Sequence, residues 1–261
     1  MRAIIIIIIG FTAGMLSGLL GIGGGIILVP AMVYLLGMSQ HRAHGTSLAV
    51  ISLIALASSI LYGKSGNVDW TIAIVLAVGG VMGALVGARL CSRTGAPQLR
   101  KFFGLLMAVV AVSMLFDAAD ALFAGGRFQL PALALPTIGF WGILLVLGIG
   151  VATGILSGLL GVGGGVIMIP AMILLLGLSQ KLAQGISLAV IVPVSISGTL
   201  IHFKQGNIRF DVWKWLTIGG VLGGVVGVHV AIGLDDMILR GIFGILFLVV
   251  AILTLRGGSS D

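Results

Sequence analysis

Long runs of apolar residues, separated by short polar or glycine-rich breaks, divide the chain into two sets of five segments. Most segments approach the roughly 20 residues that an apolar helix needs to cross a bilayer, but the second segment of each set is too short. The pattern predicts an all-α integral membrane protein in which each short segment is either one arm of a re-entrant hairpin or a short, tilted crossing. The segments lie at about 3–20, 25–37, 43–62, 71–90 and 102–118, and at about 138–160, 165–178, 183–202, 213–233 and 239–255.

The second set of segments repeats the sequence of the first. Residues 14–67 align with residues 154–207 without a gap, and 29 of the 54 aligned positions are identical. Self-similarity at a fixed offset indicates two structurally similar units. The sequence therefore predicts four regions: an N-terminal membrane repeat at 1–120, a linker at 121–135, a C-terminal membrane repeat at 136–256 and a tail at 257–261.

The two repeats are expected to have opposite orientations in the membrane. The short segment brings the chain back to the side where the first segment began, so each repeat makes an odd net number of crossings. Loop 89–101 carries four Lys or Arg residues and no acid, whereas its counterpart 229–240 carries two Asp residues and one Arg. Because Lys and Arg concentrate in cytoplasmic loops, we predict inverted-topology repeats in a multi-pass protein of the plasma (inner) membrane, with both termini cytoplasmic.

Composition supports a membrane location and excludes several functions. The chain is 59% hydrophobic and 8% charged, while a soluble domain carries about 25% charged residues. The net charge of +7 fits basic cytoplasmic loops, so we expect contact with the lipid bilayer and no binding of nucleic acid. The sequence holds no metal-ligand cluster, nucleotide-binding loop or nucleophile motif. We expect neither an enzyme nor a cofactor, and transport that is secondary, channel-like or powered by a separate subunit.

Three consecutive glycines separate the first segment of each repeat from the second. Such a turn can adopt positive φ angles and lets a ligand approach the bare backbone, and the free N–H groups of the helix that follows attract anions. Two turns entering from opposite faces would meet near the midplane, where inverted-repeat transporters bind their substrates. We predict that one small anion binds there, the alternative being that the glycines only allow close helix packing. The glycines are Gly23, Gly24, Gly25, Gly163, Gly164 and Gly165.

Small residues and hydroxyls recur beside these turns. Gly45 with Ser47, and Gly185 with Ser187, open the third segment of each repeat. We expect both serines in the first helical turn, donating hydrogen bonds to the oxygens of an anion; the alternative is capping or interhelical bonding. Ser17 and Ser157, which lie shortly before the glycine turns, are candidates on the same grounds.

Polar residues at the segment ends are candidates for gating or for attracting anions. Lys64 and Lys204 occupy matching positions in "GKSGN" and "FKQGN". The alternative is that both lysines extend to the lipid headgroups. His202 parallels Tyr62 and can carry a proton near neutral pH; a place at the membrane interface is its alternative role.

The fourth segment of each repeat carries a GxxxG series, at Gly79, Gly83 and Gly87 and at Gly219, Gly223 and Gly227. Such faces allow close helix packing. Their partner is either a helix of the same chain or a second subunit, which leaves room for a homodimer.

The motif "SGLLGxGGGxxxxPAM", present twice and followed each time by "GxSLAV", resembles the sulfite exporter family named for TauE and SafE. The resemblance covers both halves and implies transport of sulfite, sulfonates or related sulfur-containing anions. We therefore predict a secondary transporter of a small anion, with sulfite or a small organosulfonate as the leading substrate, that exports it by alternating access between the inverted repeats. An anion channel and a non-transporting membrane scaffold or assembly factor are the alternatives.

Overall fold

The computed structural model describes residues 2–91, 104–105, 107–116, 119, 139–160 and 165–256. Every regular element in these ranges is a helix, which agrees with the predicted all-α class. The predicted linker 121–135 and tail 257–261 lie outside the described residues. The helices are α1 (Arg2–Leu20), α2 (Gly25–Tyr34), α3 (Gln40–Lys64), α4 (Trp70–Cys91), α6 (Phe140–Leu160), α7 (Gly165–Leu176), α8 (Gln180–Lys204), α9 (Phe210–Gly233) and α10 (Asp236–Arg256), with a short apolar helix at Met107–Phe116.

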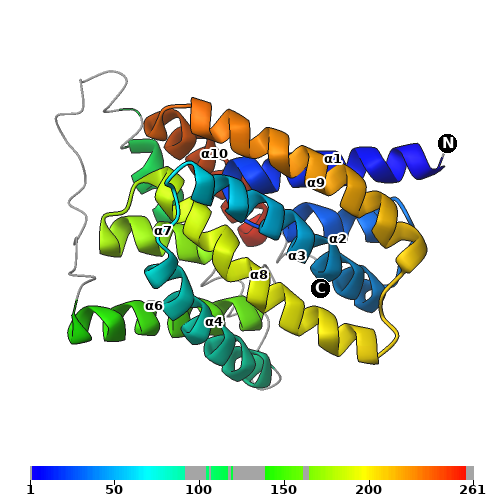
Figure 1. Ribbon diagram of the computed structural model, residues 1–261, viewed down its shortest axis with the longest axis horizontal. Coiled ribbons are helices and arrows are strands. Elements are labelled where there is room, and N and C mark those ends of the chain that lie inside the picture. The colour runs from blue at the N-terminus through cyan, green and yellow to red at the C-terminus, as the bar shows by residue number, and fades with distance from the viewer. Residues whose placement is uncertain are drawn as a thin grey trace.

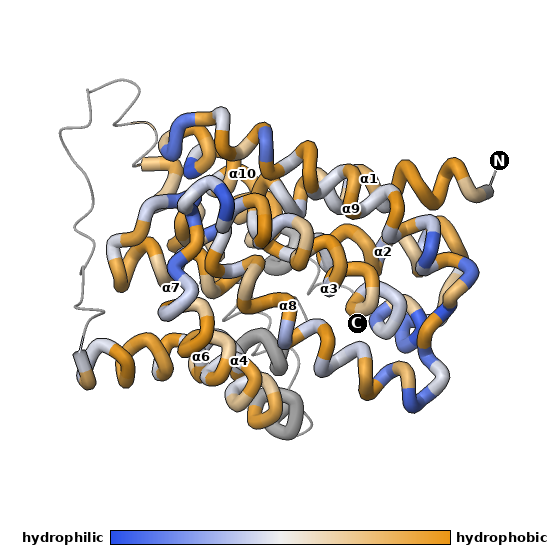
Figure 2. The backbone as a smooth tube through the Cα atoms, in the orientation of Figure 1, coloured by the Kyte–Doolittle hydropathy of each residue, from blue (hydrophilic) through white to orange (hydrophobic). Residues whose placement is uncertain are grey.

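Four of the described helices, α1, α3, α8 and α9, contain segments long and apolar enough to cross a membrane. Helices α1, α3, α8 and α9 extend largely along the long axis of the molecule (Figure 1). Apolar residues dominate the helices, and hydrophilic residues gather near helix ends and in the connections (Figure 2). The molecule is therefore built to lie in a bilayer, with its polar groups gathered at the two ends of the helices.

Helices α2 and α7 are short, as the sequence predicts. They have 10 and 12 residues, which is about 15–18 Å of helix against a hydrocarbon thickness of about 30 Å. Each contains a proline, Pro30 in α2 and Pro170 in α7. A proline inside a helix removes one backbone hydrogen bond and favours a bend.

Glycine faces bring helices from the two halves into backbone contact. A Cβ atom on Gly223 of α9 would overlap the carbonyl oxygen of Phe11 in α1, and one on Gly227 would overlap that of Met15. Residue numbers rise together along this contact, so α1 and α9 run parallel. Helices α4 and α6 form the equivalent parallel pair, in which Gly83 meets the carbonyl oxygen of Val151. The described part of both GxxxG series therefore packs within the chain.

Helices α3 and α8 cross the middle of the molecule in opposite directions. A Cβ atom on Gly45, near the start of α3, would lie 2.9 Å from His202 Cβ, near the end of α8. At the other end, one on Gly185 would lie 3.0 Å from Tyr62 Cβ. Since Gly45 and Gly185 are equivalent positions of the repeat, α3 and α8 are equivalent helices of the two halves, and they are antiparallel.

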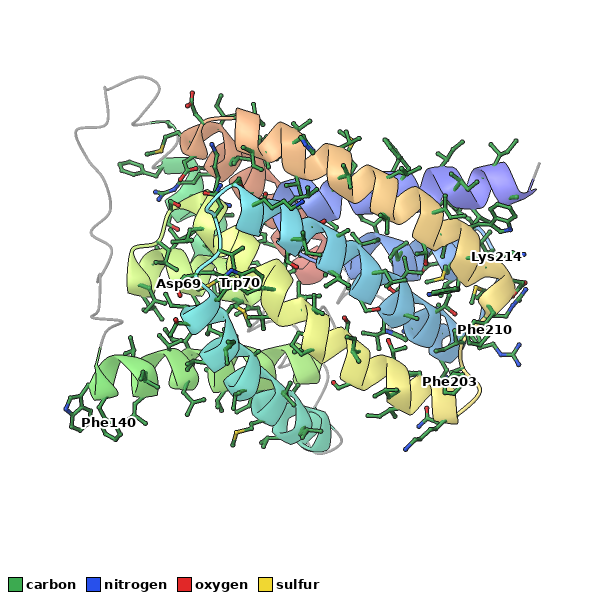
Figure 3. The ribbon with its side chains drawn as sticks, in the orientation of Figure 1. Asp69, Trp70, Phe140, Phe203, Phe210 and Lys214 are labelled. Carbon is green, nitrogen blue, oxygen red and sulfur yellow. The ribbon has the colours of Figure 1, made fainter. Side chains whose placement is uncertain are left out.

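The molecule consequently has two distinct ends. The first, called here the Arg209 end, holds the starts of α1, α3 and α9 and the end of α8; the Arg209 N–H donates a 3.0 Å hydrogen bond to Thr46 Oγ1. The second, the Asp236 end, holds the starts of α8 and α10, where the Gln180 N–H donates to Asp236 Oδ2 at 3.0 Å. Phe203, Phe210 and Lys214 lie at one end of the molecule and Phe140 at the other (Figure 3).

Candidate functional site

The chain turns sharply between α1 and α2 because three glycines there adopt left-handed backbone angles. Gly21, Gly23 and Gly24 have φ values of 71°, 80° and 74°, a region that other residues enter only with strain. Gly24 is the N-cap of α2, and its carbonyl oxygen accepts the first helical hydrogen bonds, from Ile27 and Leu28. The N–H groups of Gly25 and Ile26 thus have no acceptor within the helix, and they lie at the positive end of its dipole.

The backbone of the first glycine turn lies close to its neighbours. A Cβ atom on Gly24 would lie 3.0 Å from the Ala13 carbonyl oxygen, and one on Gly25 would lie 3.1 Å from Ile51 Cδ1. Gly23 faces both central helices, since a Cβ atom there would lie 3.2 Å from Ile191 and 3.3 Å from Ile51. The turn therefore lies between α3 and α8 at the middle of the molecule.

Two buried hydroxyls beside this turn have no hydrogen-bond partner. Ser17 is 0% exposed and Ser47 is 1% exposed, and neither hydroxyl oxygen has a partner in the structure described. A Cβ atom on Gly24 would lie 3.4 Å from Ser17 Cβ, and one on Gly25 would lie 4.0 Å from Ser47 Oγ. Buried hydroxyls are normally hydrogen-bonded, so an unsatisfied pair at a helix N-terminus has the chemistry of a site for an oxygen-rich anion.

The predicted positions of Ser47 and Ser187 were too close to the starts of their helices. We expected them in the first turn, but α3 begins at Gln40 and α8 at Gln180, so both serines lie about two turns further in. The polar residues ahead of them are themselves helical. In α8 the Ser179 hydroxyl caps this earlier start by accepting a hydrogen bond from the Leu182 N–H. The shift moves both hydroxyls from the helix ends toward the middle of the molecule.

The two halves meet where the second glycine turn ends. The Ser187 hydroxyl donates a 2.9 Å hydrogen bond to the Gly21 carbonyl oxygen. A Cβ atom on Gly165, the first residue of α7, would lie 2.8 Å from that same oxygen and 3.0 Å from Ile22 Cα. The starts of α2 and α7 are therefore both next to the first glycine turn.

Some predicted site residues cannot be placed in this way. Gly163 and Gly164 lie outside the described residues. Ser157 belongs to α6, but its side chain is likewise outside them. The described part of the centre comprises Ser17, Gly21–Gly25, Ser47, Gly165 and Ser187.

The remaining candidates lie away from this centre. Gly45 and Gly185 occupy tight crossings between α3 and α8, where a Cβ atom on Gly45 would lie 2.6 Å from the Asn207 carbonyl oxygen. Lys64 and Lys204 are the exposed last residues of α3 and α8; because these helices are antiparallel, the two lysines lie at opposite ends. His202 lies beside Gly45, with its Nδ1 buried and without a hydrogen-bond partner in the part described.

One buried polar contact was missed by sequence reasoning. The Tyr62 hydroxyl lies 3.0 Å from the Gly18 carbonyl oxygen and 2.9 Å from the Gln184 side-chain amide. Its single proton can serve only one acceptor at a time, and both side chains are fully buried. The contact joins α1, α3 and α8 next to the glycine turn, because Gly18 lies three residues before Gly21. The available signal was a glutamine within an otherwise apolar run, at the position that His44 occupies in the first repeat.

The interior around the glycine turn carries no ionised side chain among the described residues of its helices. Residues 3–34, 43–63, 165–176 and 182–201 include no Asp, Glu, Lys or Arg. The polar groups available there are backbone N–H groups, hydroxyls and one amide. Neutral donors at helix N-termini can bind an anion without a fixed counter-charge.

The proteins that this chain resembles in sequence are named as probable membrane transporters. The chain is 30% identical over 246 residues to a probable membrane transporter protein of Xylella fastidiosa, covering 93% of this chain and 91% of that protein. It is 29% identical over 240 residues to the probable membrane transporter protein YunE of Bacillus subtilis, covering 87% and 88%. A third relative, from Methanocaldococcus jannaschii, is also a probable membrane transporter protein, 28% identical over 209 residues and covering 78% and 73%.

The family model described as "Sulfite exporter TauE/SafE" matches residues 1–114 and 146–261, which takes in both halves and both glycine motifs. Its relatives are named as transporters rather than enzymes. The chain belongs to the sulfite exporter TauE/SafE family of membrane transporters.

Proposed function

We propose that this transporter is a secondary carrier of a small anion, with sulfite or a small organosulfonate as the leading substrate. The observation that carries the proposal is the start of α2, where free N–H groups and two buried, unpartnered hydroxyls, Ser17 and Ser47, surround a backbone kept bare by Gly24 and Gly25. Oxyanions accept several hydrogen bonds at once, and a helix N-terminus supplies donors of fixed direction. The family resemblance supports a sulfur-containing anion on independent grounds.

We further propose that the two halves are inverted repeats whose relative movement alternates access to this site. Antiparallel α3 and α8 support the inversion. The hairpin of α1 and α2 has its outer ends at the Arg209 end, and that of α6 and α7 at the Asp236 end, so the two hairpins approach the centre from opposite faces. This is the geometry in which interrupted helices bind a substrate near the midplane.

Charge at the two ends supports an orientation. Among residues whose side chains the structure describes, the Arg209 end has four cations and one carboxylate, whereas the Asp236 end has three cations and three carboxylates. By the positive-inside rule the Arg209 end, where α1 begins, faces the cytoplasm. Helix α10 starts at the Asp236 end and has 21 residues, about 31 Å, so it can return the C-terminus to the same side. The residues counted are Arg42, Lys204, Arg209, Lys214 and Asp211, against Lys64, Lys181, Arg240, Asp69, Asp235 and Asp236.

Export is the favoured direction on energetic grounds. An anion leaving a cell whose interior is negative gains about 2.3 kcal/mol per charge at 100 mV. Uptake would need a coupled ion. We therefore propose export of the anion down its electrical gradient.

The test is counterflow of labelled sulfite into proteoliposomes, with taurine, sulfoacetate, thiosulfate and sulfate as trans-side competitors. Gly25→Val places a side chain against Ile51 beside the Ser47 hydroxyl, while Gly148→Val is a matched control in α6, where a Cβ atom would have nothing within 4 Å. We expect saturable exchange that is lost in Gly25→Val and kept in Gly148→Val. Flux without counterflow would identify a channel instead, and no flux of any anion through folded protein would favour a scaffold.

A further inference from the structure

Two pairs of polar side chains occupy equivalent positions at opposite ends of α3 and α8. Under the 140-residue offset of the repeat, position 44 matches position 184 and position 62 matches position 202. The pair at the Asp236 end is Tyr62 with Gln184, and the pair at the Arg209 end is His202 with His44. Equivalent positions of the two repeats therefore carry a tyrosine and a glutamine at one end of the molecule and two histidines at the other.

The pair at the Asp236 end keeps one charge state at neutral pH. The Tyr62 hydroxyl contacts the Gln184 amide at 2.9 Å and the Gly18 carbonyl oxygen at 3.0 Å. An amide does not titrate, and a phenol keeps its proton near neutral pH. This contact connects the end of α1 to α3 and α8, and it does not depend on the pH at that end near neutrality.

The pair at the Arg209 end consists of two residues that can titrate near neutral pH. His202 packs on Gly45, where a Cβ atom would lie 2.9 Å from His202 Cβ and 3.1 Å from its Cγ. Its Nδ1 is buried and has no hydrogen-bond partner in the structure described. His44 precedes Gly45 in the chain and interacts electrostatically with both His202 and His41.

The surroundings of the pair are basic. Asp211, the carboxylate among the described residues of this end, is bound by the Arg209 guanidinium, with Arg209 Nε donating to Asp211 Oδ1 at 2.9 Å. This hydrogen bond raises the pKa of Arg209, so the arginine stays charged. The titratable or charged groups on the elements packed here are His41, Arg42 and His44 of α3, His202 and Lys204 of α8, Arg209, Asp211 and Lys214 around the start of α9, and Tyr34 of α2.

A proton bound at His202 would therefore be poorly accommodated while this end is closed. His202 is half-buried, but a proton on its buried Nδ1 would have no acceptor, which costs free energy, and the neighbouring cations add repulsion. Separation of the start of α3 from the end of α8 would let water reach Nδ1 and remove most of that cost. Protonation thus favours opening.

We propose that His44 and His202 form a proton-binding site that opens the Arg209 end of the transport pathway, while Tyr62 and Gln184 hold the Asp236 end independently of pH. The proton comes from water at the Arg209 end, adds to the lone pair of an imidazole nitrogen and returns to that water when the end closes. The pathway itself rests on the proposed function. The ligand of this site is the proton, distinct from the transported anion.

The experiment measures opening without measuring transport. In a Cys91→Ala background, which removes the chain's single cysteine, Ser47→Cys places a thiol beside Gly25. The protein is held in lipid nanodiscs, and a water-soluble thiol reagent is applied at about pH 5.5 and about pH 7.5, values that bracket the usual titration of histidine. The matched variant carries His44→Gln and His202→Tyr, which copies the Tyr62–Gln184 pair onto the Arg209 end. At each pH, the modification rate of the protein with both histidines is divided by the rate of this variant, which cancels the intrinsic pH dependence of the thiol.

We expect this rate ratio to rise about tenfold at the lower pH, the effect of a proton that binds ten times more tightly to the open state than to the closed one. An unchanged ratio in folded protein would overturn the proposal. Should the double variant not fold, His202→Gln alone makes the same comparison. Absence of anion counterflow by the chain without these substitutions, together with an intact pH effect, would instead overturn the proposed function and leave the proton site standing.

Discussion

The Ser187 hydroxyl of the second half donates a 2.9 Å hydrogen bond to the Gly21 carbonyl oxygen of the first. This bond and the close approach of Gly165 to the same oxygen connect the start of α7 to the turn that opens α2. The start of α7 and the first glycine turn, which belong to different halves of the chain, therefore lie together. Movement of one half against the other has to change this contact.

Removing the Ser187 hydroxyl is expected to destabilise the junction. Ser187→Ala leaves a buried carbonyl oxygen without its donor, which should cost about 1 kcal/mol. Ser195→Ala is the control, because that hydroxyl donates to Val192 within its own helix. Thermal unfolding in detergent should show a lower midpoint for Ser187→Ala than for Ser195→Ala; equal midpoints would mean that the bond between the halves adds no stability.

The Ser47 hydroxyl is expected to contribute to anion transport. Ser47→Ala removes a donor from the start of α2, and a hydrogen bond to a charged group is worth about 1.5–3 kcal/mol, so the apparent KM for the anion should rise about tenfold or more. Ser58→Ala is a matched control, since Ser58 is also a buried, unpartnered serine of α3 but faces Gly224 of α9. Counterflow kinetics separate the two, and similar KM values would count against Ser47 as a ligand.

The Tyr62 hydroxyl is expected to stabilise the fold. Tyr62→Phe leaves the Gly18 carbonyl oxygen and the Gln184 amide without this partner in a buried place, at a cost of about 1–3 kcal/mol. The chain has two tyrosines, and Tyr34, which is 85% exposed, supplies the control Tyr34→Phe. Unfolding of both variants is compared by thermal melting, and a Tyr62→Phe protein as stable as the control would contradict this role.

The inverted topology predicts opposite exposure of equivalent loops. Ser65 and Gln205 occupy matching, exposed positions after α3 and α8. In a Cys91→Ala background, Gln205→Cys should react with an impermeant thiol reagent only from the cytoplasmic side, and Ser65→Cys only from the opposite side. Labelling of intact cells and of inside-out vesicles tests this, and reaction of both cysteines from one side would exclude inversion.

Local features of the fold were predictable from the sequence because they depend on local chemistry. Three glycines followed by a short apolar run predict a break and a short helix, and α2 begins directly after Gly24 as expected. The GxxxG series likewise predicts close packing. The sequence did not determine which helix packs against this series, because the series fits any smooth helix face. The structure places Gly223 against Phe11 of α1.

Contacts between the halves were harder to predict. The Tyr62–Gln184 pair spans 122 positions and depends on α3 and α8 being antiparallel with a particular offset, which no single helix specifies. The error over Ser47 has a different cause. Helix α3 extends through the polar residues from Gln40, so the apolar run marked where burial begins and not where the helix begins.

The most direct test of a small anion at the start of α2 is protection of a cysteine at position 47. In the Cys91→Ala, Ser47→Cys protein, the rate of modification by a water-soluble thiol reagent is measured with and without methanesulfonate, a sulfonate that does not react with thiols. Gln205→Cys in the same background serves as the unprotected control. A bound anion should slow modification at position 47 in a saturable manner and leave position 205 unaffected. If an anion that the protein exchanges gives no protection at position 47, the substrate does not bind at the glycine turn.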